Sequence, residues 1–401
     1  MRGAIAIDGG RDGTGDVQVS GSKNAGLPLM AATLLAAGPS KLHGLPPLSD
    51  IKKMGSILQY LGADVSRVGG NLKINTTNAT SLFIPLQLTR ILRASILFLG
   101  PLVARFGYAC LSFPGGCSVG KLTDGHIEAR ASRLQGATIY MEIPSVTRTM
   151  NLIMAACLAR GVTHIHNAAR EPEVGDLINL LVLMGVDIYG TGTDHLVIHG
   201  RSAPLSPCQY EAMEDRIEAG TFLILGAICG NPLTVHPCHP EQHAMLIKKL
   251  RAVGARVDIA DNSITVQKAR KPLAVDILIG PYPAFPTDLQ PQFIVLLCLA
   301  QGTSHVIESI FESRFSQCFG LQAMGADIRI CEETAIISGV EKLSGALMSG
   351  SDLRASASLV LAAVASRGRS IVGGVRYIDR GYHDLERKLA KIGVIIERLP
   401  N

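Results

Sequence analysis

One short phrase recurs six times in this 401-residue chain: Gly, then Ala or Val, any residue, and Val or Ile. Its copies contain Gly62, Gly136, Gly185, Gly254, Gly325 and Gly393. Most copies lie roughly 70 residues apart, and the interval from Gly136 to Gly185 is shorter. A period of this length indicates a fold built from copies of one supersecondary unit.

Most copies follow an apolar stripe at helical spacing, such as Met54, Leu58 and Leu61. Gly just past such a stripe is typical of a left-handed helix cap, so each copy predicts an amphipathic helix that leads into a strand. A second phrase, rich in Ala and Leu, ends at Gly38, Gly107, Gly161, Gly230, Gly302 and Gly368. Because the two phrases recur at similar intervals, we expect six α/β units, each with two helices and several strands. The interval between successive copies of each phrase is shorter at the third unit. We therefore expect roughly 15–20 residues, a strand pair, to be missing between Gly136 and Gly161.

Composition limits the class of protein. With 47% hydrophobic and 18% charged residues, the chain can bury a large core, and its length favours two or three domains. Aromatic residues make up only 4%, and the net charge of +5 comes without a basic block, which argues against nucleic acid and membrane-surface partners and favours a small anionic ligand. No uncharged apolar stretch reaches the roughly 18–20 residues of a membrane-spanning helix. The nine scattered Cys and the absence of a signal-peptide pattern indicate a cytoplasmic protein with reduced thiols.

The segment FPGGCSVGK looks the most reactive. Its glycines allow close backbone approach to a ligand, and Lys121 places positive charge near Cys117, which favours the thiolate. The alternative is an inert buried Cys, the commoner case. In SGSKNA, Lys23 and Asn24 precede an apolar run, where they could bind an anion at a helix start or belong to an ordinary capped turn.

Charged residues in apolar or small-residue contexts form a second group of candidates. The arginines are Arg93, Arg170, Arg314, Arg354 and Arg380. Guanidinium groups bind phosphate and carboxylate bidentately, so together they could hold a multiply anionic ligand, although each alone could be a structural ion pair.

Three further segments carry side chains that could take part in chemistry. Asp288 follows two prolines in a loop, where a carboxylate could act as a general base. Asp215, Arg216 and Glu218 could serve a site or form a charged helix N-terminus. HPCHPEQH (236–243) invites a zinc interpretation, but its spacing matches no common zinc signature, and we expect no metal there.

Ten motifs, in order along the chain, closely resemble the enolpyruvyl transferase family: SGSKNA, LRASILFLGPLVARFG, PGGCSVG, NAAREPE, DRIEAGTFL, PAFPTDLQ, FESRF, EKLSGA, SDLRASASLVLA and IDRGY. The resemblance spans almost the whole chain. It implies an inside-out α/β barrel of two domains, each with three βαβαββ units around internal helices. One domain would be residues 23–212 and the other residues 1–22 plus 213–401, with hinges near Lys23 and Asp215.

The resemblance also implies an activity. An enolpyruvyl group would move from phosphoenolpyruvate to the 3′-hydroxyl of UDP-N-acetylglucosamine, with release of phosphate, in the first committed step of peptidoglycan precursor synthesis. No metal or organic cofactor is implied, and the protein would be a monomer or weak homo-oligomer. Ligand-driven closure of the two domains would exclude water from the reaction.

The same resemblance assigns roles to individual residues. Cys117 would act as an acid or form a transient thiol adduct, and would be the target of fosfomycin. Asp288 would accept the proton of the attacking hydroxyl. Phosphoenolpyruvate would be bound by Lys23, Arg93, Lys121, Arg354 and Arg380, of which Lys23 and Arg380 also count as catalytic. The sugar nucleotide would contact Asn24, Arg93, Asp124, His126, Ser145, Val146, Asp288, Ile310, Phe311 and Arg314.

Three departures from the family pattern fall in residues 23–212. The loop after the PGGC motif is one residue shorter and has Lys121 where the family has arginine, which keeps the charge but loses the planar fork. Ser145 and Val146 are followed by Thr147 where the family has Gly, and the third unit is short. Two alternatives therefore stay open: a divergent enolpyruvyl transferase with another nucleotide or sugar acceptor, and a non-catalytic UDP-sugar-binding paralogue.

Overall fold

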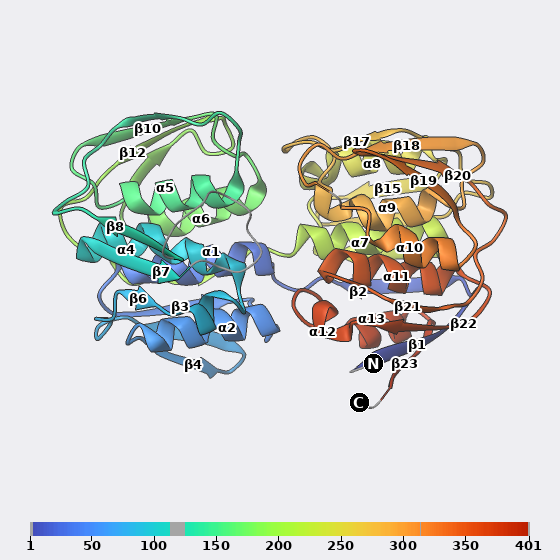
Figure 1. Cartoon of the computed structure of the whole chain (residues 1–401), viewed down its shortest axis with the longest axis horizontal. Coiled ribbons are helices and arrows are strands. Elements are labelled where there is room, and N and C mark those ends of the chain that lie inside the picture. Colours follow the sequence, from blue (N-terminus) through green and yellow to red (C-terminus); the bar gives the residue numbers. More distant parts are fainter. Residues whose placement is uncertain (1–2, 113–124, 313, 400–401) are drawn as a thin grey trace. The chain divides into compact units, whose positions relative to one another are not determined.

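The computed structural model describes residues 3–112, 125–312 and 314–399. They form two compact units: unit 1 comprises Met1–Ser20 and Glu214–Asn401, and unit 2 comprises Gly21–Met213. Each unit contains three β-sheets with helices between them (Figure 1). Each unit also has its own cluster of buried apolar side chains, one drawn from residues 5–19 and 217–394 and the other from residues 27–212.

The three sheets of unit 1 have four strands each, in the orders β21-β22-β1-β23, β15-β16-β14-β2 and β17-β18-β20-β19. The strands are β1 (Ala4–Gly9), β2 (Gly13–Gln18), β14 (Gly230–His236), β15 (Arg256–Ala260), β16 (Ser263–Gln267), β17 (Ile277–Leu278), β18 (Thr303–Ile307), β19 (Asp327–Cys331), β20 (Thr334–Ser338), β21 (Leu347–Ser349), β22 (Gly368–Gly373) and β23 (Ile395–Leu399). The N-terminal segment is part of this unit, because β1 lies between β22 and β23 and is antiparallel to both.

The helices of unit 1 are α7 (Arg216–Cys229), α8 (Ala244–Ala252), α9 (Gln290–Leu297), α10 (Gln317–Ala323), α11 (Leu353–Ala365), α12 (Val375–Ile378) and α13 (Leu385–Lys391), with the short 3-10 helices η3 (Pro240–His243) and η4 (Thr287–Leu289). Nearly every residue of α7, α9 and α11 is buried. These three helices lie inside the unit and the sheets lie outside them (Figure 1), which explains why the helix sequences are apolar on all sides. The inside-out α/β barrel predicted from the sequence is confirmed.

Unit 2 contains the sheets β13-β3-β5-β4, β6-β7-β8 and β11-β12-β10-β9. The strands are β3 (Pro39–His43), β4 (Asp64–Val68), β5 (Asn71–Asn75), β6 (Phe83–Ile84), β7 (Tyr108–Ser112), β8 (His126–Arg130), β9 (Thr138–Tyr140), β10 (Val162–His166), β11 (Asp187–Tyr189), β12 (His195–His199) and β13 (Gln209–Glu211). The helices are α1 (Lys23–Ala32), α2 (Ser49–Tyr60), α3 (Leu86–Thr89), α4 (Leu99–Phe106), α5 (Val146–Ala156) and α6 (Pro172–Leu183), with the 3-10 helices η1 (Thr33–Leu35) and η2 (Arg93–Phe98).

Among the described residues of the whole chain, the longest helix is α7, with 14 residues. None of these helices is therefore long enough to cross a membrane, which takes about 20 residues.

Five of the six glycines in the first repeat register are left-handed helix caps, with φ between +91° and +104°: Gly62, Gly185, Gly254, Gly325 and Gly393. The sixth, Gly136, is not one of the residues with positive φ. Its N–H donates to the Arg160 carbonyl at 2.8 Å, and a Cβ on it would lie 2.3 Å from the Val162 carbonyl oxygen. Gly345, which precedes the edge strand β21 of unit 1, has the same contacts with the carbonyls of Arg367 and Arg369. Gly136 thus leads into an edge strand and does not end a helix.

The shortened part of the chain lies in another segment than the repeat had indicated. Among the residues that the structure describes, the sheet β6-β7-β8 has three strands and the other five sheets have four. Only residues 113–125 connect β7 to β8, whereas in the first sheet of unit 2 residues 44–70 connect β3 to β5 and contain α2 and β4. The shortening therefore lies in the connection between β7 and β8, which has about half as many residues as the connection between β3 and β5, and not between Gly136 and Gly161 as the repeat had indicated.

Candidate functional site

Asp288 is at the centre of a charged cluster in unit 1. It lies in η4, directly before the buried helix α9. Its Oδ1 accepts from Arg314 Nη2 at 2.7 Å, and its Oδ2 accepts from Arg354 Nη2 at 2.9 Å. The side chain of Asp288 is 26% exposed, that of Arg314 19% and that of Arg354 only 4%. Three residues singled out in the sequence, far apart along the chain, thus meet in one place.

Arg314 also organises the segment that follows β18. Its Nη1 donates to the Thr287 hydroxyl at 2.8 Å, and that hydroxyl donates to Glu308 Oε2 at 2.7 Å. The other oxygen of Glu308 accepts the backbone N–H groups of Ile310 and Phe311. The Arg314 guanidinium lies over the Phe311 ring, 4.9 Å from its centre. Ile310 and Phe311 are therefore held beside the charged cluster with their apolar side chains exposed.

Arg354 is the second residue of the buried helix α11, whose N-cap is Asp352. The Asp352 carboxylate accepts from the backbone N–H groups of Arg354 and Ala355, at 2.8 and 3.0 Å. The second arm of the guanidinium, Nη1, donates to the Tyr382 hydroxyl at 3.3 Å. The backbone and both terminal nitrogens of Arg354 are thus fixed.

The charges of this cluster depend on one another. Burial by itself would raise the pKa of Asp288, but the positive charges of Arg354 and Arg314 and their hydrogen bonds hold that pKa well below its usual range. Burial by itself would lower the pKa of Arg354, but the negative charge of Asp288 raises it. While both arginines bind it, the Asp288 carboxylate is ionised and is a weak base. An anion that attracts either arginine would raise the pKa of Asp288 and make it a better proton acceptor.

Arg380 is the remaining site residue predicted in unit 1. It follows α12, and its backbone N–H donates to the Tyr377 carbonyl at 3.2 Å. It is half-buried and lies two residues before Tyr382 in the chain.

In unit 2, Lys23 is the first residue of α1, and the Ser22 hydroxyl caps that helix by accepting from Ala25 N–H at 3.2 Å. Lys23 Nζ lies 3.5 Å from the buried carboxylate of Asp50 in the first turn of α2, as does Nζ of Lys53. Asn24 is partly exposed beside it. Two lysines thus lie beside the same buried carboxylate.

The other predicted residues of unit 2 occupy separate elements. Arg93 is exposed at the start of η2, and His126 starts β8, where its ring stacks on Phe83 with 5.9 Å between ring centres. Ser145 is the N-cap of α5, although its side chain makes no capping bond, and Val146 is the first residue of that helix. Cys117, Lys121 and Asp124 lie outside the described residues.

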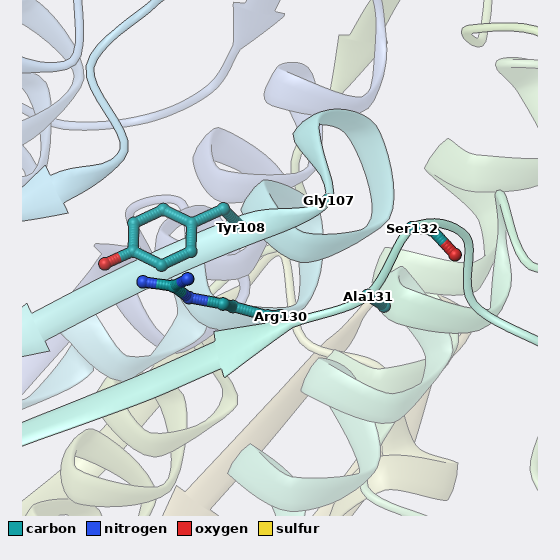
Figure 2. A pocket seen from close by; sticks show the side chains of 5 residues that line it. All are labelled: Gly107, Tyr108, Arg130, Ala131 and Ser132. Atoms are coloured by element: carbon teal, nitrogen blue, oxygen red, sulfur yellow. The ribbon is translucent and has the colours of Figure 1, made fainter.

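A cavity of about 610 Å³ lies beside β7 and β8 in unit 2, and Figure 2 shows its lining of Gly107, Tyr108, Arg130, Ala131 and Ser132. The Arg130 guanidinium lies 4.9 Å from the centre of the Tyr108 ring. The lining contains none of the site residues predicted from the sequence. This cavity is at the end of the two strands away from residues 113–125, so we do not include it in the candidate site.

Asp215 and Glu218, which the sequence left open, have structural roles. Asp215 is the N-cap of α7 and accepts from the N–H groups of Ile217 and Glu218. The Glu218 carboxylate is buried and pairs with Lys388 Nζ at 2.6 Å. In HPCHPEQH, His239 faces Glu214 and Glu241, and His243 is buried. Within residues 3–112, 125–312 and 314–399, no three His, Cys, Asp or Glu side chains are grouped so as to hold a metal ion.

Sequence reasoning missed the neutral polar side chains that support the charged cluster: Thr221, Thr287, Gln292 and Tyr382, together with Glu308. A usable signal existed for two of them. Thr221 interrupts the apolar run of α7 and Gln292 directly precedes that of α9, and a polar residue in a fully buried helix needs a partner.

Comparison with known proteins agrees with this architecture. A model of the family EPSP synthase (3-phosphoshikimate 1-carboxyvinyltransferase) matches residues 7–121 and 123–389. The chain is 44% identical over 414 residues to the UDP-N-acetylglucosamine 1-carboxyvinyltransferase of Desulforapulum autotrophicum, covering 98% of this chain and 99% of that protein. The protein of the same name from Geobacter metallireducens is 43% identical, with the same coverage.

Solved structures show the same fold. The enolpyruvyl transferase NikO from Streptomyces tendae superposes with a TM-score of 0.88 at 26% identity, over 100% of this chain and 99% of that one. The EPSP synthase from Acinetobacter baumannii superposes with a TM-score of 0.75 at 17% identity, over 99% of this chain and 100% of that one. The second likeness concerns the fold alone.

Proposed function

Because this chain belongs to the EPSP synthase family of enolpyruvyl transferases, we propose that it transfers the enolpyruvyl group of phosphoenolpyruvate to the 3′-hydroxyl of UDP-N-acetylglucosamine and releases phosphate. The observation that carries the proposal is near-full-length identity of 42–44% to proteins named for that reaction. The reaction is the first committed step of peptidoglycan precursor synthesis. Both substrates are charged metabolites, and we place the reaction in the cytoplasm.

The charged cluster of unit 1 supports this chemistry. The transfer replaces the bond from C2 of the enolpyruvyl group to the phosphate oxygen by a bond to the acceptor oxygen, so the acceptor hydroxyl must lose a proton and phosphate must leave. Asp288 would accept that proton. Arg354 and Arg380 would bind the phosphate and carboxylate of phosphoenolpyruvate, since guanidinium groups bind both bidentately. An arginine drawn from Asp288 to the substrate would raise the pKa of Asp288 when a base is needed.

The remaining roles rest on the resemblance of the motifs. In unit 2, Lys23, Arg93 and Lys121 would bind phosphoenolpyruvate, and Cys117 would act on it as an acid or a transient nucleophile. The sugar nucleotide would contact Asn24, Arg93, Asp124, His126, Ser145 and Val146 from unit 2, and Asp288, Ile310, Phe311 and Arg314 from unit 1.

The deciding experiment measures phosphate released from phosphoenolpyruvate with and without UDP-N-acetylglucosamine. We expect release only with the acceptor, and a mass increase of the acceptor by one enolpyruvyl group. A folded sample that binds UDP-N-acetylglucosamine but releases no phosphate would favour the non-catalytic alternative.

A second candidate function follows from the short connection between β7 and β8. That region carries His126 and, by resemblance, the loop that contacts the nucleotide. A divergent transferase would use another nucleotide or sugar acceptor. A screen of acceptors, read by mass spectrometry, separates the two: release that is faster with another acceptor by tenfold or more would support the divergent enzyme.

A further inference from the structure

The hydroxyl of Tyr382 lies where three polar side chains meet in the core of unit 1. The residue is 2% exposed. Its oxygen lies 2.9 Å from Thr221 Oγ1, 3.2 Å from Gln292 Nε2 and 3.3 Å from Arg354 Nη1. Thr221 and Gln292 are buried on α7 and α9, and Arg354 is buried on α11. All three internal helices of the unit thus contribute one partner.

Counting protons fixes the direction of each hydrogen bond. The Thr221 hydroxyl donates its only proton to the Ile217 carbonyl at 2.7 Å. The bond between Thr221 and Tyr382 therefore uses the phenol proton, and Tyr382 is the donor. The lone pairs of the phenol oxygen are then left to accept from Arg354 and Gln292. The same amide nitrogen of Gln292 also donates to Thr221 at 3.1 Å.

The arrangement stabilises one orientation of the Arg354 guanidinium. Nη2 binds Asp288 and Nη1 binds Tyr382, so the two terminal nitrogens are held by partners of different kinds. The bond to Asp288 is the one that must weaken if an anionic substrate attracts Arg354. The bond to Tyr382 is neutral and leaves the full charge of the guanidinium available to the substrate. Burial raises the pKa of Tyr382 even with Arg354 beside it, so the phenol keeps its proton.

The cluster also has a feature that packing alone would not select. Oε1 of Gln292 is buried and has no hydrogen-bond partner among the described residues, because the amide turns its nitrogen toward Thr221 and Tyr382. An unsatisfied buried oxygen is destabilising. A core selected for stability alone would be expected to carry an apolar residue there.

We propose that Tyr382 is a positioning residue for Arg354, which it holds, together with Thr221 and Gln292, in the orientation that binds phosphoenolpyruvate. The proposal rests on the proposed function, in which Arg354 contacts that substrate.

The test replaces Tyr382 by Phe, which keeps the ring and removes the acceptor. We expect the KM for phosphoenolpyruvate to rise about tenfold or more, as for the loss of a hydrogen bond to a charged group. The KM for UDP-N-acetylglucosamine should stay within about twofold. A purely structural role would lower kcat through the folded fraction and leave both KM values unchanged.

The matched control is Tyr377→Phe. Tyr377 also accepts from an arginine, Arg376 Nη2 at 3.1 Å, but on the surface of the unit. This variant should leave both KM values unchanged. If Tyr382→Phe does not fold, Thr221→Val and Thr221→Ser decide the question: Val should raise the KM for phosphoenolpyruvate and Ser should restore it.

The outcomes separate the two proposals. A wild-type protein without acceptor-dependent phosphate release would contradict the proposed function. An active Tyr382→Phe or Thr221→Val variant with an unchanged KM for phosphoenolpyruvate would overturn the role of Tyr382 alone.

Discussion

At the scale of single residues, the chemistry of Asp288 is set by what surrounds it. A loop aspartate is ordinarily a solvated carboxylate, but here each oxygen faces a different arginine. Neighbouring positive charge favours the ionised form and weakens the base. Under the proposed function, Asp288 would therefore accept a proton only after a substrate has changed its environment, so that the arrival of the anion would activate the base.

Replacement of Asp288 by Asn should lower kcat by about 100-fold or more, the usual contribution of a general base. The KM for phosphoenolpyruvate should not rise, because Arg314 and Arg354 lose a competing anion. Steady-state kinetics checks both values. The control is Asp276→Asn, since Asp276 binds His305 outside the cluster. A kcat within threefold of the wild-type value would exclude Asp288 as the base.

A second residue-scale prediction concerns stability and pH. Burial, followed by the charges of Arg216 and His239, lowers the pKa of His243 from 6.5 to about 3. The unfolded chain therefore binds a proton below about pH 6.5 that the folded chain does not, and stability falls as the pH drops from there toward 3. Between pH 7 and pH 5 this costs about 2 kcal/mol.

Urea denaturation at several pH values measures that loss. His243→Gln should be less stable at pH 7 but should lose less stability on acidification than the wild-type protein. His199→Gln, at an exposed position of β12, should follow the wild-type slope. Equal slopes for His243→Gln and the wild-type protein would contradict the prediction.

At the scale of secondary structure elements, the same short phrase has two structural meanings. Five copies end a helix in a left-handed glycine, whereas the copy at Gly136 leads into β9. The residues around Gly136 fit the phrase, but no apolar helical stripe precedes it. The stripe, and not the glycine, is what identifies a helix end.

Substitutions can distinguish the two kinds of glycine. At Gly185, φ is +104° and a Cβ would have nothing within 4 Å, so the cost of Ala is conformational, about 1–2 kcal/mol, and Asn should cost less. At Gly136 the Cβ would lie 2.3 Å from the Val162 carbonyl oxygen, so Asn should be no better than Ala. Unfolding free energies of the four variants test this. A clear gain from Asn over Ala at Gly136 would show that the glycine is a helix cap after all.

At the scale of the whole molecule, one of the two units is continuous in the chain and the other is not. Unit 2 is continuous, from Gly21 to Met213, and has its own apolar core. Unit 1 needs residues from both ends of the chain, because β1 separates β22 from β23 and β2 pairs with β14. Without the N-terminal segment, two sheets of unit 1 would lose a strand, and Ile5 and Ile7 would leave its core.

We therefore expect residues 21–213 to fold when expressed alone, with cooperative thermal unfolding by circular dichroism. Residues 214–401 alone should not unfold cooperatively. The matched control joins residues 1–20 to residues 214–401 through a flexible linker and should restore the transition. Cooperative unfolding of residues 214–401 with an unchanged midpoint would show that β1 and β2 are dispensable.

The sequence by itself determined the repeat, the glycine-capped amphipathic helices and the family motifs, because these depend on local periodicity, helix caps and side-chain type. The internal helices and the roles of the site residues came only from the resemblance to the family. Only the tertiary structure decided that Asp288, Arg314, Arg354 and Tyr382 converge, that Gly136 precedes a strand, and that the shortening lies between β7 and β8. The physical reason is that strand pairing and helix packing join positions that are distant in the chain. A local sequence pattern does not show which distant segment a given residue will pack against in the fold.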